Sequence, residues 1–214
     1  MGASVPPGAD PGRPTGSAID ETPPHGPDAL PRTAFADRVD AALLKLGGAL
    51  SWIWLLLLAV IVLNVVLRYV FGEGRVEFEE IQWHLYAIGF LGSLSLAVVT
   101  DDHVRVDVVH ERLSPRHKAW IELYGTLLLL GPFLTLVLVN ALPFVAAAWR
   151  SGEISQAPGG LPLRWAIKAV LPLAFALLAL AALARLTRVT ALLFGIPAPR
   201  PAATRADASP PEPR

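Results

Sequence analysis

The chain has 214 residues, of which 53% are hydrophobic and only 17% are charged, and its mean hydropathy is +0.49. A water-soluble domain does not normally tolerate such a composition, so we expect a polytopic membrane protein. Lys plus Arg balances Asp plus Glu at 18 each, which leaves no net basic charge to attract nucleic acid. With no cysteine there is no disulfide, no thiolate metal site and no cysteine nucleophile.

Both ends of the chain are predicted to be disordered. Residues 1–31 are rich in Pro, Gly, Ser and Asp, and residues 191–214 form a tail rich in Pro, Ala and Arg. Such segments cannot bury enough apolar surface to offset the loss of chain entropy. The first apolar run begins only after residue 45 and is too long for a signal peptide. We therefore expect the structured part over residues 32–190.

The first predicted membrane span covers about residues 46–70. Residues 32–46 precede it with apolar and charged side chains at helical spacing, which predicts an interfacial lead-in helix. Asn64 and Arg68 lie four residues apart near the end of the span and so share one face. Polar side chains on this face suggest that it meets protein or lipid headgroups rather than lipid tails.

The second predicted span covers about residues 79–100. A short glycine-containing turn, residues 72–77, separates it from the first span, so the two should form an antiparallel hairpin. Glu79 and Glu80 open the second span at the depth where Arg68 closes the first. They could pair with Arg68, bind a cation or transfer protons. Alternatively, they favour the helix N-terminus through its dipole and lie in headgroup water.

A third helix should begin at Ser114 and Pro115, because Ser is a good N-cap and Pro suits the first helical position. The valine-rich segment before it, residues 101–113, is predicted to be a short interfacial helix, since free strand edges are hard to satisfy beside a bilayer. The third span, about residues 119–145, belongs to an apolar stretch too long for an untilted helix. It should tilt, project beyond the membrane, or kink near Pro132 or Pro143.

A polar loop, residues 150–164, leads to the fourth predicted span at about residues 165–186. The predicted fold class is therefore all-α, with four transmembrane helices and interfacial amphipathic helices. Lys and Arg near the span ends set the orientation. The N-terminal flank before the first span, the second loop and the C-terminal flank after the fourth span together carry ten Lys and Arg residues. The first and third loop regions carry five. Both termini should therefore be cytoplasmic.

The sequence shows little apparatus for catalysis or cofactor binding. His84 is the only histidine within a span, whereas a haem-binding bundle needs facing histidines. His103, His110 and His117 recur every seven residues, but Pro115 breaks the helix between them. No phosphate-binding loop, nucleophile elbow or zinc-protease motif occurs. Polar residues of the third loop could line a solute path, but four aliphatic spans leave little room for one. The chain is interpreted as a non-enzymatic partner subunit.

Several short motifs, in this order and spacing, point to a known family. They are Asn64-x-x-x-Arg68-Tyr69, Glu79-Glu80 with Trp83, His103-Val104-Arg105-Val106-Asp107, Leu113-Ser114-Pro115-Arg116, Gly152-Glu153-Ile154-Ser155, Pro158-Gly159-Gly160-Leu161-Pro162, and Arg164-Trp165 before Pro172. Over residues 38–188 the chain resembles the small, DctQ-type membrane subunit of tripartite ATP-independent periplasmic (TRAP) transporters, especially the mannitol/chloroaromatic compound branch. It departs from that family in its Pro-rich tails and in Leu173-Ala174, where a glycine is usual.

The resemblance implies a four-span subunit of the bacterial inner membrane, surrounded by membrane lipids and joined to a large permease subunit. A periplasmic solute-binding protein would deliver an organic acid, and a sodium gradient would drive uptake. Ion and substrate sites would belong to the large subunit, so this chain would hold no cofactor and would act as a scaffold. The candidate subunit-interface or structural residues are Asn64, Arg68, Glu79, Glu80, Trp83, His103, Arg105, Asp107, Glu153 and Ser155. The alternative is a membrane anchor or redox subunit that binds a cofactor through its histidines.

Overall fold

The computed structural model describes residues 30–101 and 113–198 as helices joined by short connections. Four continuous helical stretches are long and apolar enough to cross a membrane: Ala34–Val70, Val76–Thr100, Pro115–Arg150 and Arg164–Phe194. The predicted all-α class with four spans is thereby confirmed. The predicted interfacial helix around Val106 and Val109 lies outside the described residues.

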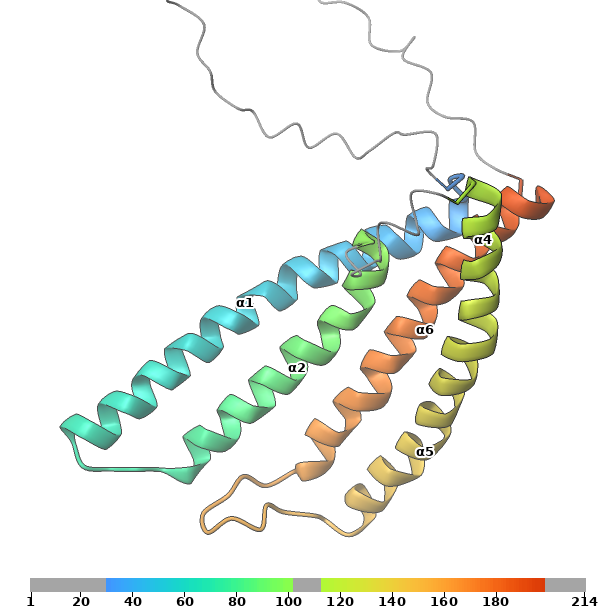
Figure 1. Cartoon of the computed structure of the whole chain (residues 1–214). Coiled ribbons are helices and arrows are strands. Elements are labelled where there is room, and N and C mark those ends of the chain that lie inside the picture. The colour runs from blue at the N-terminus through green and yellow to red at the C-terminus, as the bar shows by residue number, and fades with distance from the viewer. Residues whose placement is uncertain (1–29, 102–112, 199–214) are drawn as a thin grey trace, which may run out of the picture.

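The helices α1 (Ala34–Val70), α2 (Val76–Thr100), α6 (Arg164–Phe194) and α5 (Gly131–Arg150) lie side by side in that order (Figure 1). The short turn between α1 and α2 makes them the antiparallel hairpin that was predicted. We call the end that holds this turn and the loop of residues 151–163 the loop end. The opposite end holds the start of α1, the end of α2, α4 (Pro115–Tyr124) and the end of α6, and we call it the terminal end.

Helix α1 is continuous, so the predicted lead-in helix runs directly into the first span. Thr33 caps it, with its hydroxyl oxygen accepting from the Ala36 amide at 3.3 Å. The apolar face of the lead-in residues packs against α6, where Val39 and Leu43 are buried beside Ala181. Small alanines on α6 let the two helices approach closely, so protein covers this face of the lead-in residues.

The contact between α1 and α2 is built from glycines that receive large side chains of the opposite helix. A Cβ atom added to Gly89 would lie 3.0 Å from the Trp54 ring, and one added to Gly92 would lie 2.6 Å from Leu50. The same relation holds in the other direction between Gly47 and Leu96. Glycine at these positions therefore sets the close spacing of the hairpin.

The third span begins at Pro115 with Ser114 at the N-cap position, as predicted. It contains a π-helical segment, Gly125–Leu130, which ends two residues before Pro132, and the Gly131 amide donates to the Thr126 carbonyl five residues earlier. Pro132 has no N–H to donate to the carbonyl four residues before it, and a π-helical turn accommodates such a gap. The long helix thus changes its geometry at one of the two expected prolines.

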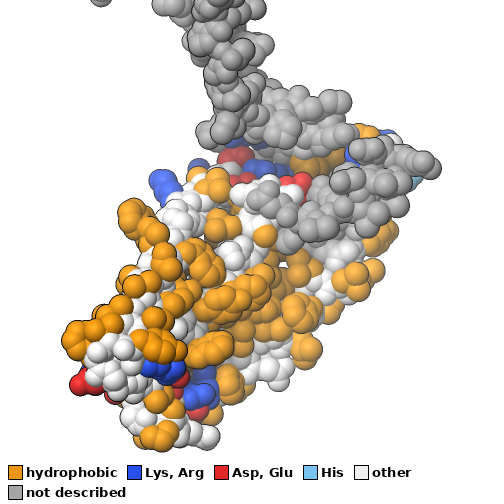
Figure 2. Space-filling view, turned by 60° about the vertical axis from the view of Figure 1, so that its left-hand side comes forward, with side chains coloured by type: hydrophobic (Ala, Val, Ile, Leu, Met, Phe, Trp, Pro, Cys, Tyr) orange, Lys and Arg blue, Asp and Glu red, His pale blue; other side chains and the backbone are white. Residues whose placement is uncertain are grey.

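Helix α6 ends at Phe194, eight residues beyond the predicted end of the fourth span. Val189 is completely buried against Ala119 and Leu123 of α4. The apolar residues after Arg188 therefore continue the helix, because they pack against α4. Residues 191–194, which were predicted to belong to a disordered tail, are therefore helical. On the face in Figure 2, apolar side chains cover the middle and charged side chains gather toward the two ends, as expected for a chain that crosses a membrane.

Candidate functional site

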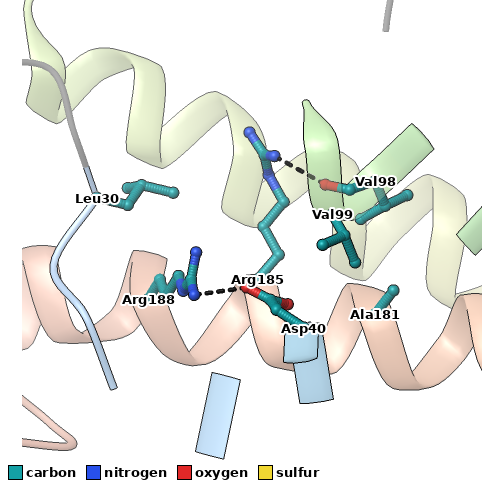
Figure 3. Close-up of a pocket in the computed structure, with 7 residues that line it drawn as sticks. All are labelled: Leu30, Asp40, Val98, Val99, Ala181, Arg185 and Arg188. Carbon is teal, nitrogen blue, oxygen red and sulfur yellow. Dashed lines mark hydrogen bonds and ion pairs between the residues drawn. The ribbon is translucent and has the colours of Figure 1, made fainter. Parts of the chain in front are cut away.

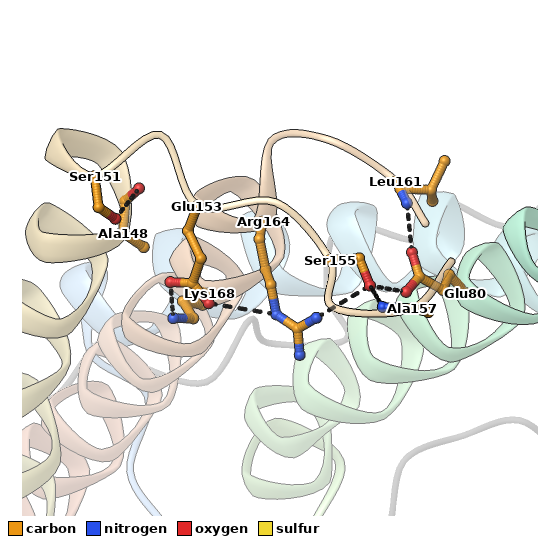
Figure 4. Close-up of polar contacts among 9 residues, drawn as sticks. All are labelled: Glu80, Ala148, Ser151, Glu153, Ser155, Ala157, Leu161, Arg164 and Lys168. Atoms are coloured by element: carbon orange, nitrogen blue, oxygen red, sulfur yellow. Dashed lines mark hydrogen bonds and ion pairs between the residues drawn. The ribbon is translucent and has the colours of Figure 1, made fainter. Parts of the chain in front are cut away.

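Charged side chains meet in two clusters, one at each end of the bundle. At the loop end, Glu80 in the first turns of α2 holds the loop of residues 151–163 (Figure 4). One of its carboxylate oxygens accepts from the Ser155 hydroxyl, and the other accepts from the Leu161 amide at 2.6 Å. Glu80 therefore binds one loop at two points, across about eighty residues of sequence.

The loop has a conformation that fits around Glu80. Its backbone pairs Ser155 with Leu161 through an amide-to-carbonyl bond of 3.2 Å, and Gly159 has a positive φ of 75°. A Cβ atom on Gly160 would lie 2.5 Å from the Ser155 Cβ, so only glycine fits there. The glycine pair thus lets the chain turn tightly enough to present both Ser155 and the Leu161 amide to one carboxylate.

Glu153 joins the same loop to the start of α6. Its carboxylate pairs with Lys168 at 2.5 Å and with Arg164 at 3.5 Å (Figure 4). The Arg164 guanidinium also donates to the Ser155 hydroxyl at 3.3 Å, and Lys168 lies 4.1 Å from the centre of the Phe144 ring. These contacts connect α5, α6, the loop and α2 in one network of charge-assisted bonds.

Arg68 pairs with Glu79 and not with Glu80, because Glu80 is engaged by the loop. Asn64 lies one turn deeper and is buried, yet its Oδ1 has no hydrogen-bond partner among the described residues. Trp83 is 72% exposed. His103, Arg105 and Asp107 lie outside the described residues.

The terminal end holds a second cluster, which sequence reasoning missed. Arg185 of α6 pairs with Glu122 of α4 and with Asp101 at 2.6 Å, and it donates to the Val98 carbonyl at 3.3 Å. One turn on, Arg188 pairs with Asp37 at 3.1 Å and with Asp40 at 2.5 Å. The signal available in the sequence was a pair of arginines spaced i, i+3 and a pair of aspartates with the same spacing, each on an apolar helix.

A small pocket of about 30 Å³ lies beside this second cluster, between α1, α2 and α6 (Figure 3). It has room for about one water molecule. Carboxylates already neutralise both arginines that line it. The arrangement therefore ties helices together and offers little space for a solute.

The histidine that is described within a span is also engaged. The Nδ1 atom of His84 lies 2.5 Å from the Glu80 carbonyl of its own helix, and because a carbonyl only accepts, Nδ1 carries the proton. Within residues 30–101 and 113–198, no three His, Asp or Glu side chains gather in a way that could hold a metal ion. The geometry of the described residues gives no support to the alternative of a redox anchor.

In a comparison with protein families, the family described as "Tripartite ATP-independent periplasmic transporters, DctQ component" matches residues 57–192, which include the second part of α1, all of α2, α4, α5 and the loop, and nearly all of α6. Comparisons with curated proteins and with solved structures found no match. The match covers well over half of the chain, and the four apolar helices agree with a multi-pass membrane component. The chain belongs to the DctQ family and is a small membrane component of a TRAP transporter.

Proposed function

We propose that this chain is the small permease subunit of a sodium-driven TRAP transporter for organic-acid uptake, and that it is a scaffold for the large permease subunit. The family match over residues 57–192 carries the proposal. The scaffold role is supported by the use of the charged residues. Arg68, Lys168, Arg185 and Arg188 each pair with carboxylates of the same chain, and these pairs connect the helices at both ends of the bundle.

The working complex in this proposal contains three proteins in and beside the bacterial inner membrane. A solute-binding protein in the periplasm delivers the organic acid, and the large permease subunit carries the sodium and substrate sites. The small subunit keeps both termini in the cytoplasm, so that its loop end faces the periplasm. A fixed scaffold needs internal rigidity, which the network around Glu80 and Glu153 supplies at that end.

The experiment is a comparison of proteoliposomes that contain this chain alone, the large permease subunit alone, or both, each with the solute-binding protein and an inward sodium gradient. We expect uptake of an organic acid only when both membrane subunits are present. Uptake by this chain alone would overturn the scaffold role. Failure of the chain to copurify with the large subunit would overturn the assignment of partners.

A further inference from the structure

Helix α5 presents hydrogen-bond acceptors at mid-membrane depth on a surface that no part of the described chain covers. It lies at one edge of the row of helices and packs along α6 through Leu134, Ala141 and Ala148 (Figure 1). Its outward side chains include Leu136 and Val139, which are 64% and 63% exposed. Asn140 lies among them and is also exposed.

Asn140 is close to the middle of the membrane. Ten residues separate it from Arg150 at the end of α5, which corresponds to about 15 Å of helix, or half of a ~30 Å hydrocarbon layer. Its Nδ2 donates to the Leu136 carbonyl of its own helix at 2.6 Å. The Oδ1 atom is then left as an acceptor with no partner in the part of the chain that the structure describes.

Pro143 leaves a second acceptor at the same depth. It lies inside α5 and has no N–H, so it cannot donate to the Val139 carbonyl four residues earlier. Val139 and Pro143 each lie two residues, or about half a turn, from the buried Ala141, and Ala148 lies on the same face as Ala141. Val139 and Pro143 therefore occupy the side of α5 opposite its buried face. Within hydrocarbon, a backbone carbonyl freed by proline normally finds a donor on a neighbouring helix.

The other edge of the row looks different. Between Trp54 and Val66 of α1, every exposed side chain is apolar, and Asn64, the one polar residue of that stretch, is buried. Lipid tails can cover such a surface, because no exposed side chain in that stretch is polar. They cannot cover the α5 edge in the same way, because they carry no hydrogen-bond donor.

We propose that the outward face of α5 around Leu136, Val139 and Asn140 is the docking surface for a membrane-spanning helix of the large permease subunit. The Asn140 amide still offers its Oδ1 as an acceptor and its second Nδ2 hydrogen as a donor, and the Val139 carbonyl is an acceptor. The partner helix therefore carries a polar side chain that can donate, such as Ser, Thr, Asn or Gln, at mid-membrane depth. This inference rests on the proposed function and adds to it the face and the chemistry of the contact.

The first test uses a photo-crosslinking amino acid, benzoylphenylalanine, in the full chain coexpressed with the large permease subunit. It replaces Leu136 on the α5 edge or, as a control, Val62 on the α1 edge, which is an exposed apolar residue within the first span. We expect a crosslink to the large subunit from position 136 and little or none from position 62. A crosslink from 62 instead, or one from 136 to a second copy of this chain, would overturn the inference.

The second test compares two nearly isosteric substitutions on α5, Asn140→Leu and Thr135→Val. Asn140→Leu should weaken the affinity for the large subunit in mild detergent by about three- to tenfold, the usual effect of one hydrogen bond between membrane helices. Thr135→Val should change it less than about twofold, since the Thr135 hydroxyl already donates to the Gly131 carbonyl at 2.9 Å. Equal effects would contradict the inference. If the unsubstituted chain does not bind the large subunit at all, the proposed function itself fails.

Discussion

At the scale of single residues, Glu80 stands out because one carboxylate organises a loop that is distant in sequence. Both of its oxygens accept from the loop, and Arg164 approaches the same Ser155 hydroxyl from α6. Hydrogen bonds to an ionised acceptor are stronger than neutral ones. The conformation of the loop therefore depends on Glu80 more than on any contact within the loop itself.

Replacement of Glu80 by alanine should release this loop. We expect amide hydrogen exchange at Leu161 to become faster by about tenfold or more, because its amide loses a charged acceptor. Mass spectrometry of peptides that contain Leu161, from protein in lipid nanodiscs, measures the rate. Glu73→Ala is the control, since Glu73 lies in the turn at the same end and its side chain makes none of the loop contacts. Unchanged exchange in Glu80→Ala would show that the loop does not need this carboxylate.

The pair of Arg68 and Glu79 should be weak. Their side chains are 51% and 42% exposed, so solvent screens most of the attraction, and we expect a coupling free energy of about 0.5 kcal/mol. A double-mutant cycle with Arg68→Glu and Glu79→Arg, followed by thermal unfolding in detergent, measures it.

The control for this cycle combines Arg68→Glu with Glu80→Arg. This second combination should show no recovery, because the Glu80 carboxylate serves the loop. A recovery as large as that of the Glu79 pair would mean that Arg68 does not distinguish the two acidic residues.

At the scale of helices, the contact between α1 and α2 depends on glycine. Gly89→Leu should lower the free energy of unfolding by about 1–3 kcal/mol, since its side chain would run into the Trp54 ring 3.0 Å from the Cβ position. Gly48→Ala is the matched control on the same pair of helices. It meets nothing within 4 Å, and alanine favours helix, so stability should stay unchanged or rise by up to about 1 kcal/mol.

Thermal unfolding in detergent distinguishes the two glycine substitutions. In addition, Trp54→Ala in the Gly89→Leu background should recover part of the loss, because it removes the ring that the new side chain meets. If Gly48→Ala destabilises the protein as much as Gly89→Leu does, the close contact at Gly89 is not the cause.

The sequence predicts helices better than it predicts how they meet. The second span, expected at residues 79–100, is helical over Val76–Thr100, because hydropathy and the acidic residues at its start mark its limits locally. The end of α6 could not be read in this way. Residues 191–194 are helical only because α4 covers Val189, and the sequence does not say which helices are neighbours.

The same limit applies to the candidate site. Arg68 and Glu79 are separated by one short turn, so their meeting follows from the hairpin alone. Ser155 meets Glu80 and Glu122 meets Arg185 only after all four spans have packed. Local spacing therefore reveals contacts within a hairpin, whereas contacts between distant spans need the tertiary structure.

At the scale of the whole molecule, the two ends of the bundle differ in charge. Among the described residues, the terminal end carries Arg32, Arg38, Lys45, Arg116, Lys118, Arg185 and Arg188 with Asp37, Asp40, Asp101 and Glu122. The loop end carries Arg68, Arg75, Arg150, Arg164 and Lys168 with Glu73, Glu77, Glu79, Glu80 and Glu153. Lys and Arg near span ends favour the cytoplasmic side, so the terminal end is expected there.

This orientation can be tested with two nearly isosteric substitutions, since the chain contains no cysteine of its own. Ser114→Cys places a thiol at the exposed start of α4, at the terminal end, and Ser151→Cys places one at the exposed end of α5, at the loop end. In intact cells, a membrane-impermeant maleimide should label the protein with Cys at position 151 and leave that with Cys at position 114 unlabelled. Opening the inner membrane should then make both reactive, which controls for burial of either thiol. Labelling of position 114 alone in intact cells would mean that the molecule is inverted. The network of Glu80 and Glu153 would then face the cytoplasm, out of reach of a periplasmic solute-binding protein.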